Sequence, residues 1–219
     1  MNTRNKISLP QDPPKLVSGA PLGIARRAMI LVHGRGATAE SIMELTTFFE
    51  EPDFAYVAPQ AKGNTWYPHS FLTPLEMNEP SLSSSMAILT HLFGELEIAG
   101  IPPSQTFLLG FSQGACLSLE YVARHARRYG GVAGLSGGLI GPDNTPRNYA
   151  GSLHGTPIFL GCSDLDFHIP KERVHHTTTV LRGIGGKVTE CLYSNMGHTI
   201  NEDEIDVVKQ MLKAIADGS

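Results

Sequence analysis

Short apolar segments alternate along this chain with longer stretches whose apolar positions recur at helical spacing. After about residue 27, the segments of strand length are Ala28–Val32, Ala55–Val57, Thr106–Leu109, Val132–Leu135, Pro157–Gly161 and Lys187–Tyr193. The stretches of helical length are Ser41–Glu50, Ser81–Ala99, Gln113–Arg128, Lys171–Arg182 and Asn201–Ala216. Almost wholly apolar strands that alternate with helices predict a mostly parallel sheet covered on both faces. The fold class is therefore α/β, in three layers.

The alternation runs through a chain of ordinary domain size. Because 41% of its 219 residues are hydrophobic, we expect a single domain over residues 1–219 that buries a substantial core. Residues 1–27 are rich in Pro and Gly, and we expect an N-terminal extension with a short strand or two. Ligands of such sheets bind at the carboxyl ends of the strands, so candidate chemistry should lie there.

Composition and charge exclude several classes of partner. The net charge is −4 and no basic run is present, which argues against nucleic acid and anionic membrane surfaces. The longest apolar run, Ala28–Val32, is too short to span a bilayer, and the first residues lack the apolar segment of a signal peptide. Cys116, Cys162 and Cys191 predict neither a disulfide framework nor a zinc site. We expect a cytoplasmic protein.

The pattern G-x-S-x-G, which surrounds many catalytic serines, occurs twice. Ser112 lies in GFSQG and Ser136 in GLSGG, so the letters alone do not choose between them. Ser112 follows a strand segment and precedes a helical stretch, which is the context of a nucleophile elbow. The segment after Ser136, GGLIGPDNTPRN, is too rich in Gly and Pro to begin a helix. We therefore predict that Ser112 is a nucleophile and Ser136 a loop residue.

A catalytic serine needs a base, and in this class of fold the chain order is serine, acid, histidine. His198 follows the strand segment Lys187–Tyr193 and precedes the last helical stretch, at the carboxyl end of a strand. We predict that His198 is the base. The other downstream histidines lie inside a helical stretch, before a strand or beside the candidate acids: His154, His168, His175 and His176.

The acid should follow the strand segment Pro157–Gly161, where the loop reads GCSDLDFHIP. Asp164 and Asp166 both lie at the correct edge of the sheet, and position alone does not choose between them. The Asp-x-Asp-x-His pattern of this loop also raises the alternative of a metal site. Nothing nearby completes a ligand set at familiar spacing, so we expect no metal.

The first strong strand ends in a turn, LVHGRGAT, that can aim a backbone N–H at the nucleophile. We assign one donor of an oxyanion hole to Arg35 or its neighbour Gly36, and the other to the N–H of Gln113. Gly34 and Gly36 would let the backbone bend and approach a substrate closely. The alternative of a phosphate-binding loop lacks the required lysine and glycine spacing. His33 is expected to orient the turn.

These segments carry a resemblance to a known family. The phospholipase/carboxylesterase family of α/β-hydrolases, which includes the acyl-protein thioesterases, is similar in five segments: LVHGRG, GIPPSQTFLLGFSQGACLSLEY, GLSGGL, DLDFHIP and NMGH. The resemblance runs from about Ala28 to the C-terminus, and GFSQGA preceded by GIPPS is its most specific part. It implies an α/β-hydrolase fold with a minimal lid and a Ser–His–Asp triad that needs no metal or organic cofactor.

The resemblance also favours one aspartate. The family's acid loop resembles H-G-D-x-D-P-x-V-P, in which the second Asp is catalytic and lies four residues before the Pro. Pro170 places that role on Asp166. This chain departs from the pattern, because Cys162-Ser163 stand for His-Gly and Phe167-His168-Ile169 for Pro-x-Val.

An aromatic-rich loop, GNTWYPHSFLTPLEMNEP, matches the place where family members carry a segment beside the site. It supplies candidates for the substrate pocket, and two later residues join them with less support: Trp66, Tyr67, Phe71, Leu72, Leu139 and Ile140. The alternative for these side chains is plain core packing.

The sequence thus predicts a serine carboxylesterase that hydrolyses short- to medium-chain acyl esters through an acyl-enzyme on Ser112. An acyl thioesterase or lysophospholipase would use the same triad, so these remain alternatives. A ligand-binding protein on an unused hydrolase scaffold is a remoter one. The expected partner is a small ester, without nucleic acid or stable membrane insertion, and a homodimer is left open.

Overall fold

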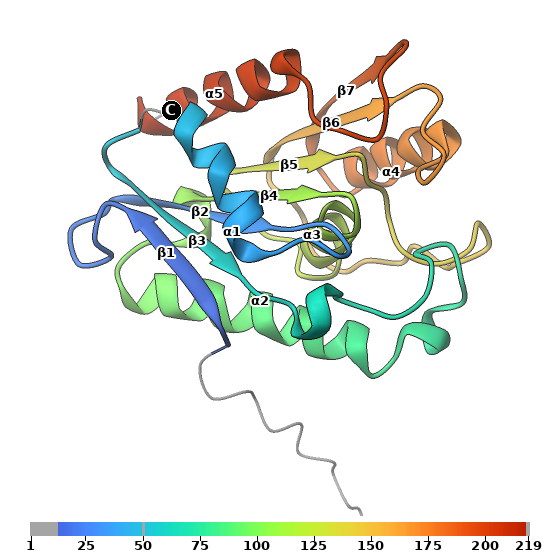
Figure 1. The fold of residues 1–219 in the computed structure, drawn as a ribbon, viewed down its shortest axis with the longest axis horizontal. Helices are drawn as coiled ribbons and strands as arrows, with labels where there is room; N and C mark the ends of the chain where they lie inside the picture. The colour runs from blue at the N-terminus through green and yellow to red at the C-terminus, as the bar shows by residue number, and fades with distance from the viewer. Residues whose placement is uncertain (1–12, 50, 218–219) are drawn as a thin grey trace, which may run out of the picture.

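A seven-stranded sheet forms the centre of the computed structural model, which describes residues 13–49 and 51–217. In chain order the strands are β1 (Lys15–Gly19), β2 (Arg27–Val32), β3 (Phe54–Pro59), β4 (Thr106–Phe111), β5 (Gly131–Leu135), β6 (Pro157–Ser163) and β7 (Lys187–Tyr193). They lie side by side in the order β1-β3-β2-β4-β5-β6-β7 (Figure 1). Only β1 runs antiparallel to its neighbour β3. The predicted mostly parallel α/β sheet is confirmed.

Helices cover both faces of this sheet. They are α1 (Ala39–Met43), α2 (Ser81–Ile98), α3 (Gln113–Arg124), α4 (Lys171–Gly183) and α5 (Glu202–Ala216), with 3₁₀ turns at Glu44–Phe48, Lys62–Asn64, Leu75–Asn78 and Pro103–Gln105. The apolar residues of α1 and α5 pack on one face, and those of α2, α3 and α4 on the other (Figure 1). Within the described part of the chain, no helix is long and apolar enough to cross a membrane.

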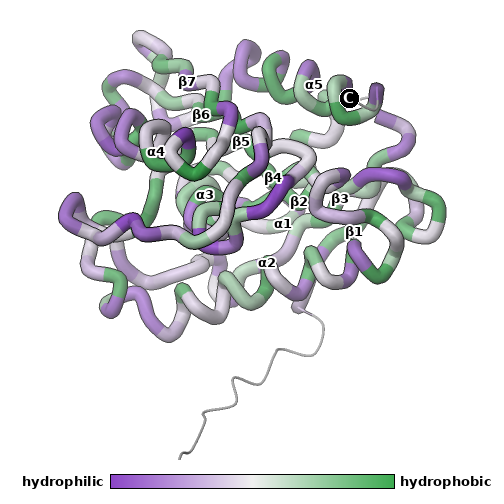
Figure 2. The backbone as a smooth tube through the Cα atoms, turned by 180° about the vertical axis from the view of Figure 1, so that it is seen from behind, coloured by the Kyte–Doolittle hydropathy of each residue, from purple (hydrophilic) through white to green (hydrophobic). Residues whose placement is uncertain are grey.

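The central strands are apolar on both sides because each face carries its own core. In β2, Ala28 and Ile30 point into the core under α2 and α3, whereas Met29 and Leu31 point into the core under α1 and α5. All four side chains are fully buried. Figure 2 shows the same division in α5, whose hydrophobic and hydrophilic residues alternate along the tube. The continuous apolar runs of the sequence are therefore strands whose two faces are both buried.

The N-terminal extension contributes one strand to the described structure. β1 pairs with β3 at the edge of the sheet, from Lys15 opposite Pro59 to Gly19 opposite Ala55. The expectation of a short strand or two before residue 28 is met by β1, and residues 1–12 lie outside the described residues. Lys15 Nζ also forms an ion pair with Glu95 of α2 at 3.0 Å.

Two helices are shorter than their patterns predicted. The stretch predicted as Ser41–Glu50 begins at a Thr38 capping box and changes to a 3₁₀ turn after Met43. There, the hydroxyls of Thr46 and Thr47 donate to carbonyls three residues earlier, which competes with α-helical bonding. Glu50 itself lies outside the described residues.

The helix predicted as Gln113–Arg128 ends at Arg124, because the following residues turn back to cover aromatic rings. The Tyr129 hydroxyl donates to the His125 carbonyl at 2.7 Å, which removes that carbonyl from helical bonding. The Arg127 guanidinium lies over the Phe93 ring, 5.3 Å from its centroid. The Arg127 contact depends on the packing of α2, which the local pattern does not contain.

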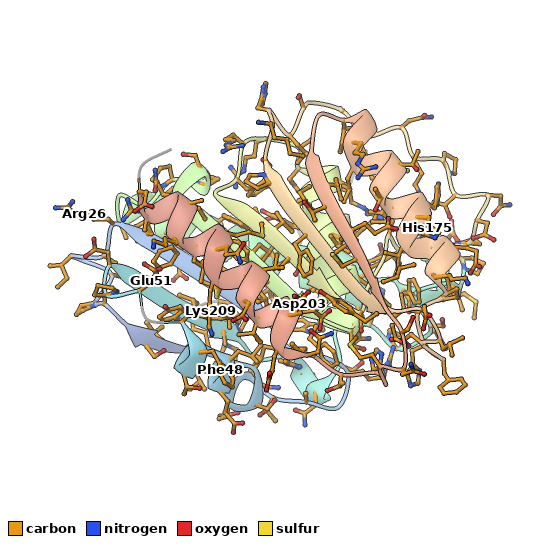
Figure 3. The ribbon with its side chains drawn as sticks, turned by 90° about the horizontal axis from the view of Figure 1, so that it is seen from above. Arg26, Phe48, Glu51, His175, Asp203 and Lys209 are labelled. Atoms are coloured by element: carbon orange, nitrogen blue, oxygen red, sulfur yellow. The ribbon has the colours of Figure 1, made fainter. Side chains whose placement is uncertain are left out.

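Helix α5 begins over a buried carboxyl group, which makes stability depend on pH. Glu204 is fully buried and packs against Gly161 of β6, where a Cβ would overlap its carboxylate. One oxygen accepts the N–H of Asn201 at 2.9 Å, and the other has no partner among the described residues. Burial raises the pKa of Glu204 to about 7. Asp203, in the first turn of the same helix, is exposed; it is labelled in Figure 3.

We expect Glu204→Gln to stabilise the protein increasingly as pH rises. A folded pKa above the unfolded one lets the folded state bind more protons, so the wild type loses stability from about pH 4.5 to about pH 7. The variant lacks this titration and should gain up to about 3 kcal/mol at about pH 8, with little gain near pH 4.5. Urea unfolding at the two pH values measures it, with exposed Glu202→Gln as the control. A gain that does not change with pH would contradict the expectation.

Candidate active site

Four loops meet at the carboxyl edge of the parallel strands. They follow β2, β4, β6 and β7, which are neighbours or near neighbours in the sheet. These loops bring together Ser112, Asp166 and His198, the three residues predicted to form a triad. The three predicted residues therefore lie where the topology of a parallel sheet places ligand sites.

Ser112 occupies a strained turn between β4 and α3. Its φ and ψ are 54° and −118°, a region that non-glycine residues rarely adopt. The turn is so tight that the flanking glycines have no room for a side chain. A Cβ on Gly110 would overlap the backbone of Gly114, and one on Gly114 would overlap the carbonyl oxygens of Val32 and His33. This geometry presents the Ser112 side chain at the start of α3.

We expect Gly114→Ala to disrupt this turn, because its Cβ would overlap backbone atoms that cannot move aside independently. The expected loss of unfolding free energy exceeds about 3 kcal/mol. The matched control is Gly94→Ala in α2, where nothing lies within 4 Å of the added Cβ. That variant should gain about 0.5–1 kcal/mol from helix propensity. Thermal and urea unfolding measure both, and equal effects would refute the steric argument.

Two short hydrogen bonds connect the three side chains of the predicted triad. His198 Nε2 lies 2.8 Å from Ser112 Oγ, and His198 Nδ1 lies 2.6 Å from Asp166 Oδ2. An ionised Asp166 accepts the Nδ1–H, which leaves Nε2 to accept the Ser112 hydroxyl proton. The Asp166 side chain is fully buried, whereas that of His198 is 22% exposed. His198, the predicted base, is thus partly exposed to solvent, whereas the carboxylate of Asp166 is enclosed.

Asp166 is held as a carboxylate by its hydrogen bonds. Its burial acts to raise the pKa, but the bond from His198 and the backbone N–H groups of His168 and Ile169 outweigh this effect and lower the pKa of Asp166. The two backbone bonds to Oδ1 measure 2.8 and 3.1 Å. The acid therefore stays ionised at neutral pH and keeps a negative charge against the imidazole.

Asp164, the alternative acid, has a different set of contacts. Its Oδ2 accepts the Ser194 hydroxyl at 2.9 Å, and its N–H donates to the Tyr193 carbonyl. It therefore ties the acid loop to the histidine loop without contacting His198 in any hydrogen bond of the described residues. No group of three or more His, Cys, Asp or Glu residues within 13–49 and 51–217 is arranged to hold a metal ion.

The turn after β2 leaves one backbone donor without an acceptor among the described residues, beside Ser112. The N–H of Gly36 donates to the Asn64 carbonyl at 2.7 Å, so it is already used. The N–H groups of Arg35 and Gln113 have no acceptor among the described residues, and Gln113 is the first residue of α3. Gly34 lies against Ser112, since a Cβ on Gly34 would be 3.4 Å from the Ser112 Cβ.

His33 orients this turn from beneath, as expected. The buried imidazole donates from Nδ1 to the Gly34 carbonyl at 2.7 Å and accepts the N–H of Ala61 at Nε2. Burial lowers the pKa of His33, which keeps the ring neutral and preserves this donor–acceptor pattern. The Trp66 indole N–H donates to the His33 carbonyl at 2.8 Å.

A cleft of about 420 Å³ opens beside Ser112. Tyr67 and Phe71, two of the predicted pocket residues, line it. The remaining predictions do not: Trp66 is bonded to the turn below, Leu139 and Ile140 are fully buried in the core, and Leu72 packs against that core. The structure thus places two of the six candidates at the cleft, because a loop's apolar residues can face the core as readily as the site. Ser136 is likewise fully buried and lies outside the cleft lining.

Sequence reasoning missed several residues that line the cleft: Pro68, His69, Ser70, Cys116, His168 and Ile169. Cys116 had a readable signal, since it lies one helical turn after Ser112 and thus on the same side of α3. Burial raises the pKa of the Cys116 thiol to about 12, so it remains a neutral lining group rather than a second nucleophile. His168 lies edge-on to His198, with ring centroids 4.8 Å apart.

Comparison with known proteins agrees with this architecture. A family model described as Phospholipase/Carboxylesterase matches residues 20–216. The crystal structure of a phospholipase/carboxylesterase from Dyadobacter fermentans has a TM-score of 0.89 and 40% identity, covering 92% of this chain and 97% of that one. A probable carboxylesterase of Oryza sativa subsp. japonica is 24% identical over 89% of this chain and 81% of its own length. Acyl-protein thioesterase 1 of Saccharomyces cerevisiae is 26% identical, over 86% of this chain and 92% of its own.

Proposed function

The chain belongs to the phospholipase/carboxylesterase family and is a carboxylic ester hydrolase, and on this premise we propose that it works through a Ser112–His198–Asp166 triad. The observation that carries the proposal is the pair of hydrogen bonds, 2.8 and 2.6 Å long, that links the three side chains. A serine bonded to a histidine, itself held by a buried carboxylate, is the arrangement that activates a hydroxyl nucleophile.

In the proposed reaction, Ser112 Oγ attacks the ester carbonyl while His198 Nε2 removes its proton. Asp166 stabilises the resulting imidazolium, which then donates the proton to the departing alkoxide. The carbonyl oxygen becomes an oxyanion at the N–H groups of Arg35 and Gln113, which have no acceptor among the described residues. Water activated by His198 then cleaves the acyl-enzyme, releases the carboxylic acid and restores Ser112.

The proposed substrates are esters with short to medium acyl chains. A cleft of about 420 Å³ is open to solvent at its His168 and His69 side, where both residues are exposed. Such a volume suits a small ligand. Acyl thioesters and lysophospholipids are the second candidates, because the same triad cleaves them and the relatives include acyl-protein thioesterases.

We expect kcat/KM on p-nitrophenyl esters to be highest between acetate and octanoate and to decline towards palmitate. The reason is the small size of the cleft, which cannot enclose a long chain. A parallel series of acyl-CoA thioesters tests the thioesterase alternative, with Ser112→Ala as the blank in both series. Highest turnover on palmitoyl substrates of either kind would contradict the proposed chain length.

A further inference from the structure

The ionisable side chains of the residues that line the cleft include basic groups and no carboxylates. The lining contains the cation Arg35 and the histidines His69, His168 and His198, and it contains no Asp or Glu. The carboxylate of Asp166, the acid of the proposed triad, is fully buried and is hydrogen-bonded to His198. An anionic group in this cleft would therefore meet a positive charge without a competing carboxylate on the lining.

Arg35 is held in the cleft wall without being neutralised. Its Nη1 donates to Thr65 Oγ1 at 3.0 Å and to the Pro68 carbonyl at 2.9 Å, and its Nη2 donates to the His69 carbonyl at 2.7 Å. All three acceptors are uncharged oxygens, and no ion pair of the described residues includes Arg35. The Nε–H of Arg35 and one of its Nη2 hydrogens have no acceptor among the described residues. These two donors are therefore available to a bound anion.

The loop over residues 65–69, which holds the Arg35 guanidinium, is itself held by hydrogen bonds from other residues. The Gln113 side chain accepts the N–H of Trp66 at 3.0 Å and donates to the Tyr67 carbonyl at 2.7 Å. The buried Asn78 accepts the N–H of His69 at 2.9 Å. Because these bonds set the loop's carbonyls, the guanidinium is oriented before a ligand arrives, and less entropy is lost on binding.

Arg35 is also close enough to act on a substrate bound at Ser112. Gly34, its chain neighbour, lies against Ser112, and Arg35 and Ser112 line the same cleft. We propose that the cleft selects esters carrying a carboxylate a few atoms from the scissile carbonyl, and that Arg35 binds this carboxylate. The inference rests on the proposed function and adds the substrate class.

Two matched pairs of substrates test it. Monoethyl glutarate and its primary amide, ethyl glutaramate, place the charge on the acyl side. Acetoxyacetate and acetoxyacetamide place it on the alcohol side. We expect the wild type to prefer the anion in at least one pair by about tenfold in kcat/KM, and the preference to fall in about 0.5 M NaCl. Neutral esters that are cleaved with no preference for the anion in either pair would overturn the inference and leave the proposed function standing.

Variants identify the residue responsible. In Arg35→Gln the preference should fall to about one, and in Arg35→Lys it should be partly retained, because lysine keeps the charge without the fork of donors. The control is Arg26→Gln, which removes an exposed arginine from the opposite end of β2 (Figure 3). A preference that survives Arg35→Gln, or is lost equally in Arg26→Gln, overturns the assignment. Absence of Ser112-dependent hydrolysis of all four esters would instead overturn the function itself.

Discussion

Ser112→Ala is expected to lower kcat on p-nitrophenyl butyrate by between about 10³ and 10⁶ while the protein remains folded. Without the hydroxyl that donates to His198 Nε2 at 2.8 Å, no acyl-enzyme forms. Removal of a small side-chain oxygen from a half-buried position should leave unfolding by urea nearly unchanged.

The matched control for this substitution is Ser136→Ala, in the chain's other G-x-S-x-G segment. Ser136 is fully buried and lies outside the cleft lining. Its loss should leave kcat within about twofold of the wild type. A folded Ser112→Ala variant that turns over as fast as Ser136→Ala would refute the assigned nucleophile.

Asp166→Asn is expected to reduce kcat by about 10⁴. An asparagine can offer an N–H to His198 Nδ1, which favours the tautomer whose Nε2 already carries a proton and cannot accept one from Ser112. The charge that stabilises the imidazolium is also removed. Single-turnover measurements should show the loss in the acylation step.

Asp164→Asn provides the control for the acid, since the two aspartates lie two residues apart in one loop. An asparagine there can still accept the Ser194 hydroxyl through its side-chain oxygen. We expect a change in kcat of less than about tenfold. Equal losses in the two variants would show that loop integrity, rather than the acid, limits turnover.

Sequence reasoning led to specific candidates where the proposed function depends on local order and strand ends. Ser112 could be chosen over Ser136 because a strand, a turn and a helix are contiguous in the chain. His198 could be predicted because a loop after a strand must lie at the carboxyl edge of a parallel sheet. Between Asp164 and Asp166, residue position gave no answer, and the choice came from the family's loop pattern.

The rest depended on tertiary contacts that no local pattern contains. The sequence does not distinguish the N–H of Arg35 from that of Gly36 as a donor to the oxyanion. The structure does, because the Gly36 N–H donates to the carbonyl of Asn64, 28 residues away. Trp66 and Tyr67 are adjacent in an aromatic loop, yet only Tyr67 faces the cleft. The end of α3 was misplaced for the same reason, because aromatic packing overrides helical propensity after Arg124.

Covalent labelling with a fluorophosphonate, followed by peptide mass spectrometry, tests the nucleophile most directly. The reagent reacts with a serine activated by its histidine and mimics the proposed attack of Ser112 on a carbonyl. We expect one adduct per chain, on the peptide containing Ser112, and none in Ser112→Ala. No adduct on the folded wild type, or an adduct on another residue that persists in Ser112→Ala, would contradict it.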